Sequence, residues 1–287
     1  MPADDGTIAW RELYDEARDQ LAAVGDTPDV DARRIVEAAS GHEGADFALG
    51  MSELVTERGM ARFDAMLARR LRGEPLQYVV GRWGFRTLDL AIDQRVLIPR
   101  PETETVVEVA LSELDRAGGH RVLDLGTGSG AIALSIAVER EETEVWAVER
   151  SADAVVVARA NLAGVGRAAT RVRIVEGSWF EALDPALEGT FDLIVSNPPY
   201  VAADDPLPAV VADWEPAEAL IPGPAGTEAI AAIVTAAPRW LRAGASLVVE
   251  LAPPQSSWAV DAAAGAGLAA EVLPDLHGRD RVLVARA

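Results

Sequence analysis

The sequence contains neither cysteine nor lysine, and all 26 of its basic residues are arginine. Without cysteine the chain can form no disulfide and no thiolate zinc site, which favours a cytosolic location. Without lysine it has no Schiff-base lysine, no pyridoxal-phosphate lysine and no P-loop lysine. These absences exclude many familiar enzyme mechanisms, whereas chemistry carried by a bound cofactor stays open.

Histidine and long apolar runs are scarce as well. The three histidines, His42, His120 and His277, show no metal-ligand spacing, so we interpret each as structural or exposed and expect no metal site. No apolar run reaches the ~18 residues that a transmembrane helix needs. Residues 1–5 are acidic and lack the basic and then apolar pattern of a signal peptide, so we expect a cytoplasmic protein with no membrane partner.

Acidic residues outnumber basic ones, 46 to 26, which gives a formal net charge of −20. A surface of this charge repels phosphate backbones, so we expect no bulk nucleic-acid binding. It tolerates or attracts a basic protein, although the acidity can equally serve solubility alone. The length of 287 residues and the hydrophobic content of 49% predict about two globular domains with an ample core.

The first 104 residues divide into two patterns. Residues 1–75 carry apolar side chains at helical spacing, which predicts an N-terminal helical domain. Residues 76–104 shift to strand-like runs, and we interpret this region as a β-hairpin linker. The runs over 78–81 and 86–90 flank Gly84, as the strands of a hairpin would.

Strands and helices alternate from residue 105 to 287, which predicts a parallel sheet covered on both faces. We expect strands over residues 121–125, 144–149, 171–175, 191–196, 245–250, 270–273 and 281–285. A short loop joins the last two strands, which makes them antiparallel. A parallel sheet that ends in an antiparallel hairpin favours the α/β fold of a methyltransferase over that of a dehydrogenase.

The most informative stretch is Asn197-Pro198-Pro199-Tyr200, directly after the expected strand over 191–196. An amide nitrogen is a poor nucleophile, so methyl transfer to it requires that its N–H groups be held and its lone pair be aimed. The Asn197 side-chain oxygen and the Pro198 carbonyl can accept the two N–H groups, and the prolines keep both acceptors rigid. Tyr200 offers a flat face to a planar amide or base. The alternative interpretation is a turn that caps the strand.

A glycine-rich turn after the strand over 121–125 predicts a cofactor site. The turn consists of Gly126, Thr127, Gly128, Ser129 and Gly130. Its glycines let backbone N–H groups approach a ligand, and ligands of such sheets bind beyond the carboxyl ends of the strands. Glu149, at the end of the next strand, is placed to accept both hydroxyls of a ribose.

The turn alone leaves two cofactors open. Its glycine spacing also satisfies the dinucleotide pattern, and Glu149 lies at a compatible distance, so a nicotinamide cofactor competes. S-Adenosyl-L-methionine fits better once the Asn197 motif is included, because it needs no pyrophosphate cradle and its amino group tolerates Asp124. Trp179, after the third strand of this domain, can stack on adenine, or else it is a core tryptophan.

These stretches together resemble the bacterial release factor glutamine methyltransferase family, also called the HemK or PrmC family, over nearly the whole chain. The motifs that carry the resemblance are Pro75-Leu76-Gln77-Tyr78, Ile98-Pro99-Arg100-Pro101-Glu102-Thr103-Glu104, Asp124 to Gly130, Ser196 to Tyr200, Trp214-Glu215-Pro216 and Asp275 to Arg281. The Asn-Pro-Pro-Tyr motif is shared with adenine-N6 DNA methyltransferases, whereas Ile-Pro-Arg-Pro-x-Thr-Glu is the more specific marker.

The resemblance implies a Rossmann-like class I methyltransferase sheet with a small N-terminal helical domain. The implied substrate is the glutamine of the Gly-Gly-Gln motif of peptide chain release factors 1 and 2. S-Adenosyl-L-methionine would give its methyl group to the side-chain nitrogen, N5, and leave as S-adenosyl-L-homocysteine. Cofactor contacts would come from Gly126 to Gly130, Glu149, Trp179 and Asn197. Asn197 and Pro198 would be catalytic, and Asn197 to Tyr200 would hold the glutamine amide.

Two positions depart from the family pattern. Ser178 stands where the family often has an acidic residue, so an acidic contact to the adenine amino group is not carried over. Glu250 is followed by Leu-Ala-Pro-Pro rather than closely by glycine, and no role is carried onto this segment.

Other functions stay open at this stage. An adenine-N6 methyltransferase of nucleic acid has the same motif but is disfavoured by the net charge and the lack of lysine. Only the family resemblance argues against a glutamine methyltransferase that acts on a ribosomal protein. A NAD-dependent reductase would have the same kind of glycine turn. A non-catalytic binding module is disfavoured, because both halves of a transfer site are present. A specific protein interface needs roughly 800 Å² per side, and the Asn-Pro-Pro-Tyr motif is too small to supply it. We therefore expect the helical domain to recognise the protein substrate. The alternative is that this domain only stabilises the chain by packing.

Overall fold

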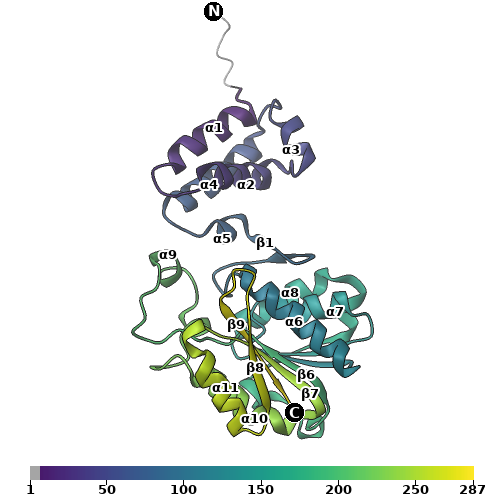
Figure 1. The fold of residues 1–287 in the computed structure, drawn as a ribbon. Coiled ribbons are helices and arrows are strands. Elements are labelled where there is room, and N and C mark those ends of the chain that lie inside the picture. The colour runs from purple at the N-terminus through teal and green to yellow at the C-terminus, as the bar shows by residue number, and fades with distance from the viewer. Residues whose placement is uncertain (1–6) are drawn as a thin grey trace, which may run out of the picture. The chain divides into compact units, whose positions relative to one another are not determined.

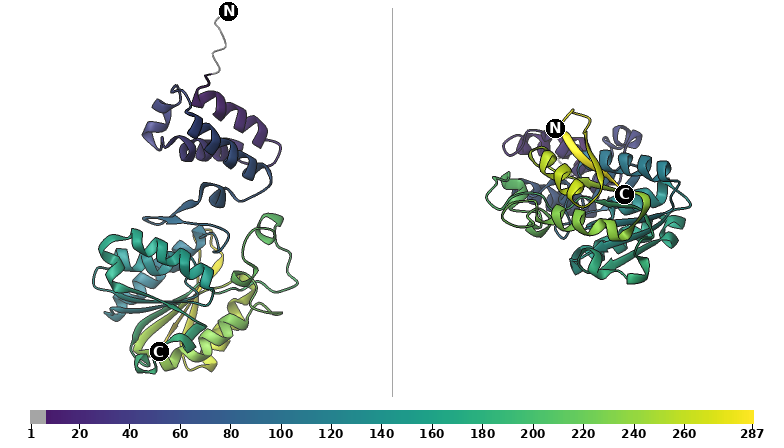
Figure 2. Two further views of the ribbon diagram at one scale, coloured as in Figure 1. Left: turned by 180° about the vertical axis from the view of Figure 1, so that it is seen from behind. Right: turned by 60° about the horizontal axis from the view of Figure 1, so that its bottom comes forward.

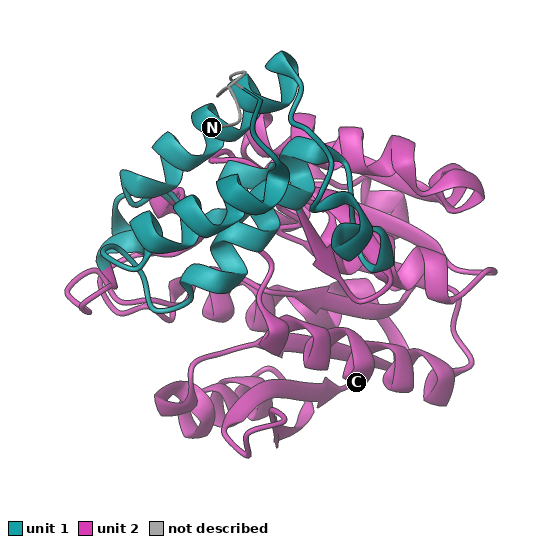
Figure 3. Ribbon diagram, turned by 90° about the horizontal axis from the view of Figure 1, so that it is seen from above, with its two compact units in different colours: residues 1–82, 209–214 teal, residues 83–208, 215–287 magenta. Residues whose placement is uncertain are grey.

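The computed structural model describes residues 7–287, so the acidic start over residues 1–5 lies outside the described part. The chain divides into two compact units, shown in Figure 3. Unit 1 consists of residues 1–82 and 209–214, and unit 2 consists of residues 83–208 and 215–287. Within residues 7–287, no helix combines the length and the apolar character that a membrane crossing requires.

Unit 1 is helical, as the sequence predicts. Its helices are α1 (Trp10–Leu21), α2 (Pro28–Ser40), α3 (Ala45–Gly50), α4 (Glu57–Leu71), α5 (Leu76–Val80) and the short α9 (Ala209–Ala212) (Figure 1). Helix α1 buries Trp10, Leu13, Ala17 and Leu21, whose spacing of three and four residues places them on one face. Helix α4 begins at the cap of Thr56, whose hydroxyl accepts the Gly59 N–H at 3.0 Å.

The strand expected over residues 78–81 is wrong, because this stretch lies in and just after helix α5. Pro75 stands at the N-cap, and Gly81 ends the helix in the left-handed conformation with φ 78°. The guanidinium of Arg69 donates to the carbonyls of Tyr78 and Val79, at 2.8 and 3.2 Å, and so satisfies acceptors at the end of the helix. The two-stranded sheet instead pairs β1 (Arg82–Phe85) with β2 (Leu88–Ala91).

Unit 2 contains a seven-stranded sheet in the order β5-β4-β3-β6-β7-β9-β8. Its strands are β3 (Arg121–Leu125), β4 (Glu144–Glu149), β5 (Val172–Glu176), β6 (Phe191–Ser196), β7 (Leu241–Glu250), β8 (Ala269–Pro274) and β9 (Asp280–Arg286). The pairs from β5 to β7 are parallel, whereas β9 is antiparallel to both β7 and β8. The predicted α/β fold, a parallel sheet with an antiparallel C-terminal hairpin, is confirmed.

Helices cover both faces of this sheet. Helices α6 (Pro101–Ala117), α7 (Ala131–Glu139) and α8 (Ala152–Gly164) pack on one face, and α10 (Glu228–Trp240) and α11 (Ser256–Gly265) pack on the other (Figures 1 and 2). Short 3-10 helices occupy connections at Gly166–Arg171, Trp179–Ala182, Pro185–Leu187, Ala217–Ala219 and Pro253–Gln255. Because both faces of the sheet are covered, side chains on both sides of the central strands are buried, and these strands are therefore almost continuously apolar.

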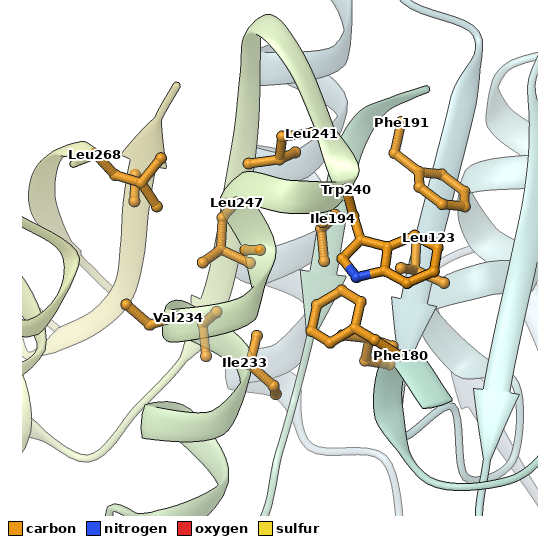
Figure 4. Packing of buried hydrophobic residues seen from close by; sticks show 14 of the residues in the cluster. Leu123, Phe180, Phe191, Ile194, Ile233, Val234, Trp240, Leu241, Leu247 and Leu268 are labelled. Carbon is orange, nitrogen blue, oxygen red and sulfur yellow. The ribbon is translucent and has the colours of Figure 1, made fainter. Parts of the chain in front are cut away.

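An aromatic core under α10 anchors the connection after β5. Phe180 stacks on Trp240 with ring centroids 5.6 Å apart, and Phe191 of β6 contacts the same indole (Figure 4). The rings sit among buried aliphatic side chains of β3, β6, β7 and α10. Because Phe180 is held in this core, its neighbour Trp179 is fixed at the margin of the sheet.

Candidate active site

The register of the sheet brings the predicted site residues to one edge. Leu125, the last residue of β3, pairs with Val148 of β4 and with Ser196 of β6. The Ser196 hydroxyl also donates to the Leu125 carbonyl at 2.6 Å. Since all three strands run parallel, the glycine turn, Glu149 and Asn197 follow at the same carboxyl edge, where open α/β sheets bind their ligands.

A cavity lies at this edge and encloses about 690 Å³ of empty space, part of it open to solvent. The predicted residues that line it are Gly126, Gly128, Glu149, Trp179, Asn197 and Pro199. Among the described residues, its lining does not include Thr127, Ser129, Gly130, Pro198 or Tyr200.

The other residues of the glycine turn build its shape. Gly126, Gly128 and Gly130 have φ values of 74°, 56° and 87°, a region that side-chain-bearing residues avoid. The Thr127 hydroxyl donates to Oδ2 of Asp124 at 2.6 Å, and the same oxygen accepts the N–H of Ala133 at 3.1 Å. These bonds tie the turn to the end of β3 and the start of α7.

Asp124 is completely buried beside this turn. Burial raises the pKa of its carboxyl to about 7, against the opposing effect of the Thr127 hydroxyl. Within the described residues, Oδ1 of Asp124 has no hydrogen-bond partner. An unpartnered buried carboxylate oxygen is unusual and fits a site that attracts a positively charged ligand group.

Glu149 is a buried carboxylate that holds backbone and faces the cavity. Its Oε2 accepts the N–H of Gly128 and its Oε1 accepts the N–H of Ser151, both at 2.9 Å. A carboxylate oxygen can accept more than one hydrogen bond, so each keeps capacity for a ligand hydroxyl. This arrangement fits the two hydroxyls of a ribose.

Trp179 has a strained backbone at the cavity, with φ 44°. A Cβ atom placed on Gly126 would lie 3.5 Å from the indole, so the ring covers the bare backbone of the glycine turn. Ser178, which also lines the cavity, supplies a hydroxyl where the family often has an acid. The indole both lines the cavity and packs against the hydrophobic core, so its stacking on adenine stays a prediction.

Sequence reasoning missed part of the cavity wall. The residues that it did not assign include Arg95, Val96, Leu97, Arg150, Ser151, Ala154, Pro216, Glu218 and Ala219. The sequence signal for Leu97 and Pro216 was their position in or next to two family motifs. In the structure, Glu215 of one motif accepts the N–H of Ile98 of the other at 3.2 Å and also binds Arg100. Glu215 thus joins the Trp-Glu-Pro motif to the Ile-Pro-Arg-Pro motif, and the neighbouring residues Leu97 and Pro216 line the cavity.

The Asn197 motif is held from behind by other elements. Nδ2 of Asn197 donates to the Thr103 hydroxyl oxygen at 3.1 Å. The Tyr200 hydroxyl donates to Oε1 of Glu250 at 3.1 Å, and Tyr200 packs against the hydrophobic core. Burial raises the pKa of the Tyr200 phenol, so this group stays protonated. Only part of the motif, Asn197 and Pro199, faces the cavity.

The sheet order, the glycine turn with its acid and the Asn197 motif define a class I S-adenosyl-L-methionine-dependent methyltransferase. The family model of the methyltransferase small domain matches residues 103–213, and that of the PrmC N-terminal domain matches residues 12–81. A methyltransferase from Pyrococcus furiosus shares the fold with a TM-score of 0.50 and 19% identity, over 76% of this chain and 96% of that one.

Two relatives narrow the class to a family. The release factor glutamine methyltransferase of Xylella fastidiosa (strain 9a5c) is 46% identical over 226 residues, which cover 78% of this chain and 80% of that protein. The release factor glutamine methyltransferase of Bifidobacterium longum (strain NCC 2705) is 39% identical over 289 residues, which cover 96% and 98%. The chain belongs to the release factor glutamine methyltransferase family, so the nicotinamide alternative is set aside.

Proposed function

We propose that this chain methylates N5 of the glutamine in the Gly-Gly-Gln motif of peptide chain release factors 1 and 2. The observation that carries the proposal is one cavity shared by a cofactor half, Gly126 and Glu149, and an amide-binding half, Asn197. Release factors act at ribosomes, so the reaction would take place in the cytoplasm. Membership in the family supports the substrate, and the geometry of the cavity supports the chemistry.

Glu149, Trp179 and the backbone of Gly126 to Gly130 would hold S-adenosyl-L-methionine. When bound, this cofactor supplies an electrophilic methyl group. The acid accepts ribose hydroxyls, the indole stacks on adenine, and the glycine turn admits the close approach that a side chain would block. Oδ1 of Asp124, which has no hydrogen-bond partner among residues 7–287, offers a further polar contact next to the turn.

The Asn197 motif would hold the glutamine amide. The Asn197 side-chain oxygen would accept one N–H group at the cavity. The carbonyl of Pro198, which is not itself among the lining residues, would accept the other, and the pair would orient the nitrogen lone pair. As the nitrogen gains positive charge, both acceptors bind it more strongly, so they stabilise the transition state preferentially. The nitrogen loses its proton to solvent after the transfer, and no histidine or cysteine base is needed.

The three sequence regions would divide the work. We assign recognition of the release factor to the helical domain, residues 1–75, and methyl transfer to residues 105–287, with residues 76–104 as the linker. Unit 1 exposes Val30, Leu49 and Leu54, with exposed fractions of 50%, 76% and 60%. These side chains are available for contact with a protein partner.

The test is incubation with labelled S-adenosyl-L-methionine and either purified release factor. We expect label on both factors and none on variants that carry Gly-Gly-Ala instead of Gly-Gly-Gln. Parallel reactions with ribosomal proteins and with DNA cover the alternative substrates. Label on DNA adenine, or on ribosomal proteins alone, would overturn the proposal.

A further inference from the structure

Glu250 ends strand β7 as a buried acid with only 1% of its surface exposed. Its Oε2 accepts the Thr103 hydroxyl at 2.7 Å and its Oε1 accepts the Tyr200 hydroxyl at 3.1 Å. Burial raises the pKa of this carboxyl, whereas the two hydroxyl donors and the charge of Arg281 lower it. The acid therefore engages the Asn197 motif at Tyr200 and the Ile-Pro-Arg-Pro-x-Thr-Glu motif at Thr103.

Thr103 is the intermediate between Glu250 and Asn197. It lies in the first turn of α6, is buried, and its Oγ1 both donates to Glu250 and accepts from Nδ2 of Asn197. A hydroxyl has one hydrogen to donate, and Thr103 donates it to Oε2 of Glu250. The lone pairs of the Thr103 oxygen are therefore left to accept Nδ2 of Asn197.

The direction of these hydrogen bonds, from Asn197 to Thr103 and from Thr103 to Glu250, determines which atom of the Asn197 amide can bind a substrate. Nδ2 is engaged by Thr103, so Oδ1 remains as the acceptor at the cavity. With the amide flipped, the same position would present N–H groups to the N–H groups of a substrate amide. Two donors cannot bind each other, and the pairing would be lost.

We propose that Glu250 is a positioning residue which, through Thr103, fixes the orientation of the Asn197 amide and leaves its oxygen for the substrate. The hydrogen bond from Tyr200 to Glu250 also fixes the last residue of the Asn197 motif. The Glu250 carboxyl group therefore positions both the first and the last residue of this motif. This inference rests on the proposed function for its effect on turnover, but the amide orientation itself exists in the free protein.

The test compares Glu250→Gln, Thr103→Val and Thr103→Ser in the full chain. A glutamine at 250 can donate to Thr103, which frees the Thr103 hydroxyl to donate to Oδ1 of a flipped Asn197. Valine has nearly the shape of threonine and no hydroxyl. We expect kcat on a release factor to fall at least tenfold in Glu250→Gln and Thr103→Val, with the Kd for S-adenosyl-L-methionine changed less than twofold. Thr103→Ser restores most of the kcat lost in Thr103→Val.

Glu113→Gln is a matched control for the loss of a buried acid. Glu113 of α6 accepts the Ser246 hydroxyl of β7 at 2.6 Å, which mirrors the pair of Glu250 on β7 and Thr103 on α6. Glu113 lies outside the cavity lining among the described residues, so its variant should lose thermal stability and keep its kcat. A similar fall of kcat in Glu113→Gln and Glu250→Gln would show a general loss of structure and overturn the proposal.

A spectroscopic readout separates this inference from the proposed function. The side-chain NH₂ signal of Asn197, identified by its loss in Asn197→Asp, should show a nuclear Overhauser effect to the Thr103 methyl in the free protein. We expect Glu250→Gln to weaken this effect and to shift the NH₂ signal, even if no release factor is methylated. An unchanged signal in Glu250→Gln, or an unchanged kcat in that variant when the wild type is active, would overturn the proposal.

Discussion

The carboxylate of Glu149 accepts the backbone N–H of Gly128 at 2.9 Å, so the acid at the end of β4 also holds the glycine turn after β3. Its second oxygen accepts the N–H of Ser151 at the start of α8. One side chain thus links two strand ends and a helix start around the cavity. Its role in cofactor binding and its role in shaping the site are coupled.

Glu149→Gln should weaken the binding of S-adenosyl-L-methionine by about 10- to 100-fold, because hydrogen bonds to a charged group contribute about 1.5–3 kcal/mol. The amide can accept through only one oxygen, and its NH₂ group meets a backbone N–H. Isothermal titration calorimetry measures the change. Asp153→Asn, which removes an exposed charge in the first turn of α8, is the control and should leave the Kd within about twofold. Equal effects of both variants would mean that charge alone, and not the contacts of Glu149, governs binding.

Asn197→Ala should lower kcat on a release factor by about a hundredfold or more, since it removes an acceptor that is strengthened in the transition state. Binding of the cofactor should change far less, because Asn197 is only one of its expected contacts and the glycine turn, Glu149 and Trp179 are untouched. Single-turnover assays with labelled cofactor separate the two effects. Near-normal turnover would rule out the proposed role of Asn197.

The sheet and its functional edge could be predicted from the sequence because the information is local. The runs over 121–125, 144–149 and 191–196 are mostly apolar, and their ends are marked by Gly126, Glu149 and Ser196, so their bounds agree with β3, β4 and β6. Parallel alternation then places their carboxyl ends together without further knowledge.

The parts that local patterns could not predict depend on distant partners. Residues 78–80 have the tyrosine and valines of a strand, but Arg69 binds the carbonyls at 78 and 79 and stabilises a helix. Glu250 received no role because its partner Thr103 is 147 residues away in the chain. No local pattern contains such a contact.

Gly226→Ala should impair turnover more than an equivalent change elsewhere. Gly226 has φ 75°, and a Cβ there would lie 2.8 Å from the Tyr200 carbonyl oxygen and from the Ala202 nitrogen, so the backbone after the Asn197 motif must move. Gly244→Ala is the control, because Gly244 has φ 78° but no atom within 4 Å of a Cβ. Both variants should lose about 1 kcal/mol of unfolding free energy from backbone strain, and only Gly226→Ala should also lose kcat. Equal kcat values for the two variants would contradict the expected link between this loop and the motif.

Asp124 should make the stability of the free protein depend on pH in a direction opposite to that of most acids. Its pKa is about 7 in the folded chain and has the ordinary value of 3.8 for an aspartate in the unfolded chain, so only the folded state holds this proton between the two values. Stability is therefore highest at the acidic side of this window and falls as the pH rises through about 7. Asp124→Asn keeps the shape and the acceptor for Thr127 and removes the titration.

The measurement is the unfolding free energy in urea from pH 5 to 8 without cofactor. The wild type should lose about 3 kcal/mol relative to Asp124→Asn across this range, because the folded pKa of about 7 lies two units above pH 5 and each unit corresponds to about 1.4 kcal/mol. Glu113→Gln is the control: ion pairing with Arg286 lowers the pKa of Glu113 to about 2, so its titration lies well below this range. The difference in unfolding free energy between wild type and Glu113→Gln should stay constant from pH 5 to 8. If the difference between wild type and Asp124→Asn also stays constant, Asp124 does not titrate in this range.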